Sequence, residues 1–485
     1  MSKKEINLCG PGDLPSGELL SGGERALRWI GDYLDRTRDH PVRARAAEGD
    51  LLADLPEEMP EDGESLERIE RDFRELVVPR VTHWNHPRFF AYFAISGSVP
   101  GILGELYSAA LNTNGMKWVT NPASAELEQR TLRWLARGLG LPDGFHGIMA
   151  DAASTATLLS LTVGREKATG FDVRRKGLYG QESPLRLYCS EEAHMSVEKA
   201  AVILGLGLDH VVRVPSDRNY RMDVAALRES VRVDRGAGRS PFAVVATLGT
   251  TAANGVDPMH GIADLCEEEN LWLHADGAYA GAAAFLPEKR GLFAGWERAD
   301  TIVVNPHKWI FTPVDASAFY FKDAEAFRRA FSILPEYLRT GERADDPMDY
   351  GFQLGRRFRA LKLWFVLRAF GRKGIEERIR FHCDLARRFA DWVDGEEEWE
   401  RLAPTPFSTV CFRHRGGGGT TKGEEELVAK NGSILEGINR SGDAYLSHAV
   451  LKGRYALRVT IGNIRTTADD VDLVRRRLVE EAVKL

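Results

Sequence analysis

The run TIVVNPHKWIF, residues 301–311, begins with apolar β-branched residues and then contains a lysine. Such a beginning is typical of a buried strand, and Asn305 and Pro306 interrupt it, so we expect Lys308 just beyond a strand end. Binding sites of α/β proteins favour such ends. Burial lowers the pKa of an amine and lets it attack a carbonyl. Alone the signal is weak, because lysines beside strands are commonly surface residues.

Similar short apolar runs alternate with helical stretches between residues 86 and 374. RLYCS, HVVRVP, FAVVATLG and LWLHAD have strand character, whereas SVEKAAVILGLG and MHGIADLCEEEN have helical periodicity. This alternation predicts a large α/β domain with a mostly parallel central sheet over residues 86–374.

The two ends of the chain have different patterns. Apolar residues at helical spacing near positions 26–34 and 66–77 predict two amphipathic helices, and we expect a helical arm over residues 1–85. A long helix around GRRFRALKLWFVLRAFG precedes strands in STVCFRH and YALRVTIG and a final amphipathic helix. Residues 375–485 are therefore expected to form a small α+β domain.

Composition limits the possible partners. The 485 residues contain 65 Lys and Arg against 71 Asp and Glu, a net charge of -6 with no long basic block, so we expect no nucleic-acid partner. The five cysteines are scattered and never spaced as CxxC, which predicts neither a disulfide framework nor a metal site. We expect a cytoplasmic protein with no membrane partner, because no apolar leader or membrane span is seen.

Three further segments contain residues that suit one cofactor. Asp276 ends the strand-like run of NLWLHADGAYAGAA, where a carboxylate can keep a pyridine nitrogen protonated; an aspartate that caps the next turn is the alternative. His194 in CSEEAHMSVEKAA can stack on a flat ring. In GIMADAASTATLLS, Ala153 and Ser154 begin a helix that can bind a phosphate. Together with Lys308 they point to pyridoxal 5'-phosphate (PLP), held by the lysine as a Schiff base.

The chain resembles the group II PLP-dependent decarboxylases of fold type I, which act on aromatic amino acids, histidine, glutamate or cysteine sulfinate. HPRFFAYF, EEAHMSVEKA, VATLGTTAANGVD, WLHADGAYAGAA, NPHKW and GRRFRALKLWFVLRAFG occur in the family's order, and the likeness covers nearly the whole chain. The resemblance implies a PLP-dependent transferase fold of type I and decarboxylation of an L-amino acid to an amine and carbon dioxide. It also implies an obligate homodimer clasped by the N-terminal helices.

The resemblance also implies a role for individual residues. Lys308 would hold PLP, Asp276 would pair with the pyridinium nitrogen, and His194 would stack on the ring. Tyr337, in FSILPEYLRTGERADDPMDY, would donate a proton after carbon dioxide leaves. The other expected cofactor contacts are Ala278, on the second face of the ring, Thr247, near a cofactor oxygen, and Ala153, Ser154, Asn305 and His307, at the phosphate. Asp151 stands where the family usually has glycine, and we expect it to point outward or to cap the helix.

The expected substrate pocket is apolar and aromatic, which favours an aromatic substrate. By the resemblance its lining is Trp84, Tyr92, Phe93, Ala94, Ile95, Met116 and Gly355, with Met116 and Gly355 reaching across from a neighbouring subunit.

Some departures from the aromatic enzymes leave alternatives open. Ala94 and Ile95 stand where those enzymes usually have Pro-Thr, and Arg88 or Lys117 would favour an acidic substrate. Aminotransfer, aldehyde synthesis and a relative without catalysis are further alternatives. Retention of Tyr337 and His194 argues against aldehyde synthesis, and retention of Lys308 and Asp276 argues against a relative without catalysis.

Overall fold

The large sheet positions most of the predicted residues. The computed structural model describes residues 12–181, 183–333, 346–416 and 423–484. Seven strands form this sheet in the order β1-β7-β6-β5-β4-β2-β3. Only β7 runs antiparallel to its neighbours, so the predicted mostly parallel sheet is confirmed. The strands span His146–Ala150 (β1), Leu185–Ser190 (β2), Val211–Val214 (β3), Ser240–Thr247 (β4), Trp272–Asp276 (β5), Thr301–Val304 (β6) and Ser317–Phe321 (β7).

Helices cover both faces of this sheet because its central strands are apolar on both sides. All residues of β5, β6 and β7 are buried. One face packs against α6 (Ala153–Ala168), α8 (Ser196–Ile203) and α12 (Ala324–Phe331). The other packs against α5 (Pro122–Leu139), α9 (Val224–Gly236) and α10 (Met259–Glu269). The short helices α7 (Val173–Lys176) and α11 (Pro306–Trp309) follow α6 and β6.

The C-terminal part forms a second, antiparallel sheet with its own core. Its order is β10-β11-β9-β8, and its strands span Trp399–Arg401 (β8), Thr409–His414 (β9), Ser447–Leu451 (β10) and Arg454–Thr460 (β11). Three helices share that core: α13 (Arg359–Gly395), α14 (Glu424–Ser441) and α15 (Ala468–Val483). Helix α13 continues across the predicted boundary at residue 374, with a kink at Gly371, whose φ is 61°.

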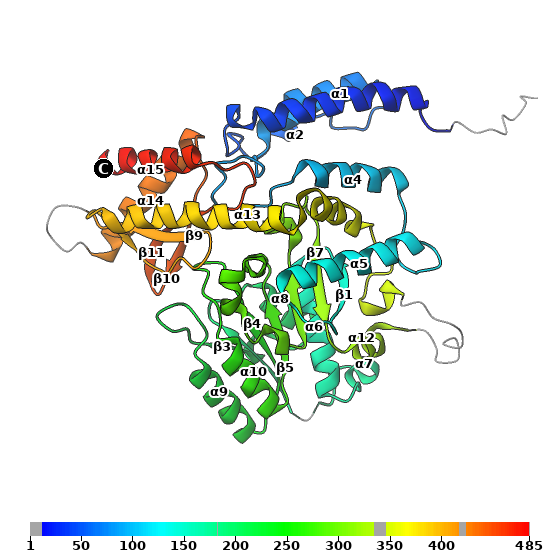
Figure 1. The fold of residues 1–485 in the computed structure, drawn as a ribbon, viewed down its shortest axis with the longest axis vertical. Coiled ribbons are helices and arrows are strands. Elements are labelled where there is room, and N and C mark those ends of the chain that lie inside the picture. The colour runs from blue at the N-terminus through cyan, green and yellow to red at the C-terminus, as the bar shows by residue number, and fades with distance from the viewer. Residues whose placement is uncertain (1–11, 182, 334–345, 417–422, 485) are drawn as a thin grey trace, which may run out of the picture.

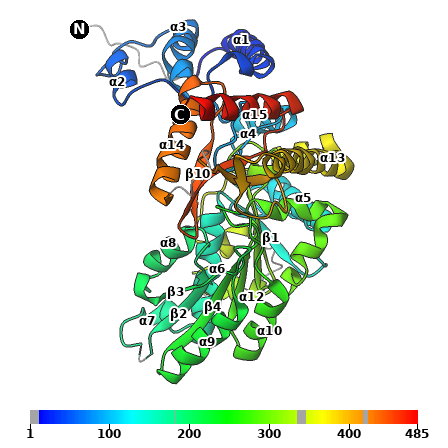
Figure 2. The same cartoon turned by 90° about the vertical axis from the view of Figure 1, so that its left-hand side faces the viewer.

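The N-terminal helices lie at one end of the molecule, away from the large sheet in both views (Figures 1 and 2). They are α1 (Ser16–Asp35), α2 (Asp50–Asp54) and α3 (Leu66–Asp72), and α4 (Val99–Leu111) lies below α1 in Figure 1. Arg25 of α1 pairs with Glu70 of α3, and Arg38 pairs with Asp470 of α15. Within the described ranges, every helix is too short or too polar to cross a bilayer.

Candidate active site

The carboxyl ends of the parallel strands converge on one cavity of about 250 Å³. Thr247 ends β4, Asp276 ends β5, and Lys308 follows β6 on the short helix α11. His194 lies between β2 and α8, and Ala153 begins α6 after β1. All the predicted cofactor contacts line the cavity, whose described walls are Phe93, Ala152, Ala153, Ser154, His194, Thr247, Gly249, Thr251, Asp276, Ala278, Tyr279, Asn305, His307 and Lys308.

Lys308 lies in an aromatic and cationic environment. Its Nζ is 5.2 Å from the centroid of the Phe93 ring, and the guanidinium carbon of Arg458 is 4.8 Å from the same centroid. Burial of the amine lowers the pKa of Lys308, Asp276 opposes that shift, and Arg458 adds to it. A lowered pKa favours the neutral amine, which is the nucleophilic form.

A stack of rings supports this wall of the cavity. Phe93 stacks on Tyr279 with centroids 4.0 Å apart, and Tyr279 stacks on Trp309 at 4.7 Å. Trp309 donates a hydrogen bond of 2.9 Å from Nε1 to Nδ1 of buried His382 on α13. The residue next to Lys308 is thereby fixed to a second element of the fold.

Asp276 is a buried carboxylate at the floor of the cavity. Its Oδ1 accepts a 3.0 Å hydrogen bond from the Ala278 amide, and only 6% of the residue is exposed. A buried carboxylate is costly unless a cation or several donors compensate it. A protonated ring nitrogen is such a compensating group.

His194 and Thr247 can both contact a ring bound in the cavity. Nδ1 of His194 accepts from the Ser196 amide at 3.2 Å, so the neutral imidazole has its proton on Nε2. Burial lowers the pKa of His194, while Asp276 acts in the opposite direction. The buried Thr247 hydroxyl makes no hydrogen bond with any described residue, although it lines the cavity. Such a hydroxyl fits the oxygen substituent of PLP.

The opposite end of the cavity suits an anion. Helix α6 begins at Ala153 with no side-chain cap, so its first amides are available to a phosphate. Asn305 and His307 lie nearby, and the Ala316 amide donates to His307 Nδ1 at 3.1 Å. Burial lowers the pKa of His307 to about 4. The residues present therefore fit PLP at both ends of the cavity.

Asp151 is held beside the cavity and is not one of its lining residues. Its Oδ1 accepts from the Ala152 amide at 2.8 Å, and Gln353 Nε2 lies 3.5 Å from its Oδ2. Because the Ala152 amide belongs to a residue that lines the cavity, the expectation that Asp151 points away from the phosphate stays a prediction.

The predicted substrate pocket is only partly gathered in this chain. Phe93 lines the cavity, whereas Trp84 stacks on Phe89 and Tyr92 has 51% of its surface exposed. Ala94 is buried, Ile95 is half-buried, Met116 is half-buried and Gly355 is exposed; none of these four lines the cavity. Tyr337 lies outside the described residues.

Several lining residues were missed from the sequence. Gly249 and Thr251 belong to the motif VATLGTTAANGVD, from which only Thr247 was selected, and Tyr279 follows Ala278 directly. Their positions after β4 and β5 are the signal that could have identified them.

Comparison with known proteins agrees with this geometry. Residues 49–415 match the family model of the pyridoxal-dependent decarboxylase conserved domain. Tyrosine decarboxylase 4 of Petroselinum crispum is 35% identical over 99% of this chain and 96% of its own length. Phenylacetaldehyde synthase of Arabidopsis thaliana is 36% identical over 97% of this chain and 96% of its own.

The solved structure of Oryza sativa TDC with PLP and tryptamine superimposes with a TM-score of 0.91 at 33% identity, covering 97% of this chain and 99% of that one. The fold type I assignment and the PLP cofactor are thereby confirmed. The chain belongs to the family of pyridoxal-dependent decarboxylases.

Proposed function

We propose that the protein decarboxylates an aromatic L-amino acid and releases the amine and carbon dioxide. The observation that best supports an aromatic substrate is the wall of Phe93, which stacks on Tyr279 and faces Lys308. Aromatic faces bind other rings by offset stacking and bind cations through their quadrupole. The tyrosine decarboxylase and the tryptamine-bound relative point to the same substrate class.

The cofactor contacts are proposed from the cavity. PLP, when bound, provides the electron sink for the pair of electrons left on the substrate Cα. Lys308 holds it, Asp276 keeps its ring nitrogen protonated, and His194 and Ala278 lie against its two faces. Thr247 donates a hydrogen bond to its oxygen substituent. The phosphate is bound by Ala153, Ser154, Asn305 and His307.

The chain's own groups also handle protons. Lys308 would hold the cofactor through its amine, and burial, which lowers the pKa of that amine, favours its nucleophilic form. Tyr337, which lies outside the described residues, is the proposed proton donor to Cα. The proposed pocket also includes Trp84, Tyr92, Ala94, Ile95, and Met116 and Gly355 of a neighbouring subunit.

An acidic substrate is less consistent with the structure. Arg88, which could have favoured such a substrate, has its Nε 3.6 Å from Asp470 Oδ1 and donates to the Arg38 carbonyl. The positive charge of Arg88 is thus paired with Asp470 of α15. Lys117 is half-buried and does not line the cavity.

A homodimer is also proposed. Leu19 and Leu20 of α1 and Leu106 and Tyr107 of α4 each expose more than half of their surface, at 73%, 74%, 51% and 56%. Apolar surface of this kind is stabilised by burial against a partner. We further propose the division into residues 1–85, 86–374 and 375–485, and a cytoplasmic location, which suits the free thiols of the four described cysteines.

Product analysis tests the proposed reaction. Purified protein with PLP is incubated with L-tyrosine, L-DOPA, L-tryptophan, L-histidine, L-glutamate and cysteine sulfinate, and amine, carbon dioxide, aldehyde, ammonia and peroxide are measured. Amine and carbon dioxide in equal amounts from an aromatic substrate are expected. Aldehyde with ammonia and peroxide would instead assign the activity of the phenylacetaldehyde synthase relative, and turnover of glutamate alone would reject the aromatic assignment.

A further inference from the structure

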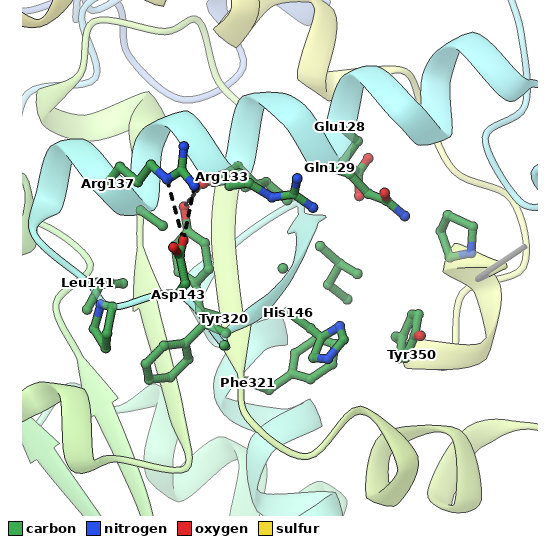
Figure 3. A pocket seen from close by; sticks show the side chains of 18 of the residues that line it. Glu128, Gln129, Arg133, Arg137, Leu141, Asp143, His146, Tyr320, Phe321 and Tyr350 are labelled. Carbon is green, nitrogen blue, oxygen red and sulfur yellow. Dashed lines mark hydrogen bonds and ion pairs between the residues drawn. The ribbon is translucent and has the colours of Figure 1, made fainter.

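Glu128 of α5 and Arg356, which precedes α13, form a buried ion pair outside the cofactor cavity. Arg356 Nη2 lies 2.7 Å from Glu128 Oε1, and the two side chains are only 7% and 5% exposed. Figure 3 shows Glu128 and Gln129 at one end of a second cavity, of about 460 Å³, under α5. At the other end Arg137 pairs with Asp143 at the surface, with side chains 61% and 76% exposed.

On one side the ion pair completes the edge of the large sheet. Strand β1 is the outermost strand, so the groups on its free edge have no neighbouring strand. The Met149 amide donates to Glu128 Oε1 at 2.9 Å, and Arg356 Nη2 donates to the Met149 carbonyl at 3.0 Å. Met149 is followed by Ala150 and then by the 151–154 turn, which here means residues 151–152 and the first two residues of α6, at the anionic end of the cofactor cavity.

On the other side the main chain of Arg356 holds the segment at residues 114–116. Its amide donates to Asn114 Oδ1 at 3.0 Å, and its carbonyl accepts from the Gly115 amide at 2.9 Å. Met116 is tied to the same region, because its carbonyl accepts from the Met348 amide at 3.1 Å. Gly355 comes directly before Arg356. Apart from its two chain neighbours, the nearest atom to the place where a Cβ of Gly355 would lie is Asn114 Nδ2, at 4.0 Å, so there is open space beside this glycine.

A buried ion pair is an inefficient way to stabilise a fold, because desolvation of both charges offsets much of their attraction. This pair instead provides geometry, since a single guanidinium joins the strand that leads into the 151–154 turn to the segment containing Gly355. We propose that Glu128 and Arg356 are positioning residues that couple PLP binding in one subunit to aromatic-substrate binding in the neighbouring subunit, whose pocket Met116 and Gly355 are proposed to reach. The substrate half of this inference rests on the proposed function.

The first test measures cofactor affinity without turnover. Apoprotein of Arg356→Lys, Arg356→Gln and Glu128→Gln is titrated with PLP and with pyridoxal, which lacks the phosphate, and tryptophan fluorescence is followed. The dissociation constant of PLP is expected to rise about tenfold, an effect typical of energetic coupling through a network. That of pyridoxal should change by less than about twofold, because the pair acts through the 151–154 turn. The double variant Glu128→Gln/Arg356→Gln should bind PLP no more weakly than the weaker-binding of the two single variants, because both substitutions break the same ion pair.

The second test measures KM and kcat for the aromatic substrate at saturating PLP. KM is expected to rise severalfold with a smaller change in kcat. Arg137→Lys, on the same helix and the same cavity, is the matched control and should leave both affinities unchanged. Thermal unfolding by circular dichroism confirms that each variant is folded; if Arg356→Gln fails to fold, Arg356→Lys and Glu128→Gln decide.

The outcomes separate the two proposals. Folded variants whose PLP affinity is unchanged would overturn the positioning role, whatever reaction the protein performs. Equal losses of PLP and pyridoxal affinity would show a merely structural defect and also overturn it. A rise in the PLP dissociation constant with an unchanged KM would reject the coupling to the substrate, and absence of any aromatic turnover would reject the proposed function alone.

Discussion

The amine of Lys308 lies 5.2 Å from the centroid of the Phe93 ring, whose own neighbour in the stack is Tyr279 at 4.0 Å. The ring therefore lies between the reactive amine and the aromatic core. This arrangement lets one side chain affect both the position of the lysine and the binding of a substrate ring.

The substitution Phe93→Leu tests that arrangement. It retains an apolar side chain but removes the aromatic face that is proposed to stack on the substrate ring, a contact worth about 1 kcal/mol, so KM for the aromatic substrate is expected to rise about fivefold. Steady-state kinetics at saturating PLP provide the measurement. Phe381→Leu, at a position on α13 that is 45% exposed, is the matched control. An unchanged KM in a folded Phe93→Leu enzyme would remove the main support for an aromatic pocket.

The substitution Thr247→Val tests the hydroxyl that has no described partner. Because Thr247 Oγ1 makes no hydrogen bond within the described part of the chain, the apoprotein should lose no stability when the hydroxyl is replaced by a methyl group. Affinity for PLP should fall about fivefold, because the bond to the cofactor oxygen, worth about 1 kcal/mol, is lost.

Thr250→Val provides the contrast, since Thr250 Oγ1 accepts from the Gly255 amide at 2.9 Å. Loss of this hydrogen bond should lower the melting temperature of the apoprotein. If Thr247→Val also lowers the melting temperature and leaves PLP affinity intact, the hydroxyl has a structural partner and no cofactor contact.

The cofactor end of the site could be predicted because its residues follow strands with a clear apolar signal. Asp276 ends an apolar run and Lys308 follows a β-branched one, and parallel strands bring their carboxyl ends to one edge of the sheet. Strands β1 (His146–Ala150) and β7 (Ser317–Phe321) were not identified, and the first merges into a small-residue turn. Their place at the edge of the sheet, with β7 between β6 and β1, depends on tertiary pairing, which a local pattern does not contain.

The substrate end was less predictable for a different physical reason. The expected pocket residues were selected by resemblance, and Phe93 is the one among them that lines the cavity in the described part of the chain. The Glu128–Arg356 pair was not predicted, because its partners are 228 residues apart in the sequence and because charged residues usually lie on the surface. Arg458 escaped for the same reason: it lies within a strand, yet only 2% of it is exposed.

Buried histidines should make the fold sensitive to acid. Burial lowers the pKa of His274, His307 and His382 from 6.5 to about 4. Because the folded pKa is lower than the unfolded one, the unfolded chain binds more protons between these values. The stabilisation is therefore complete above pH 6.5 and is lost as the pH falls toward 4, by at most about 1.4 kcal/mol per pH unit for each histidine.

The substitution His382→Gln isolates one of these contributions while keeping an acceptor for Trp309. Between pH 7 and 5 the free energy of unfolding should fall by about 2 kcal/mol less in this variant than in the unmodified protein. Urea unfolding at both pH values gives the comparison, with His146→Gln at an exposed position as the control. Equal losses in all three proteins would show that His382 does not titrate in this range.

Two substitutions should move the pKa of Lys308 in opposite directions. Asp276 raises that pKa and Arg458 lowers it, so Asp276→Asn should lower it and Arg458→Gln should raise it. The pH dependence of trace acetylation of the apoprotein, read by mass spectrometry on the peptide that contains Lys308, reports the amine directly and needs no catalysis. Exposed Lys484 in the same digest serves as the internal reference. A shift of both variants in the same direction would mean that the two charges do not control the amine.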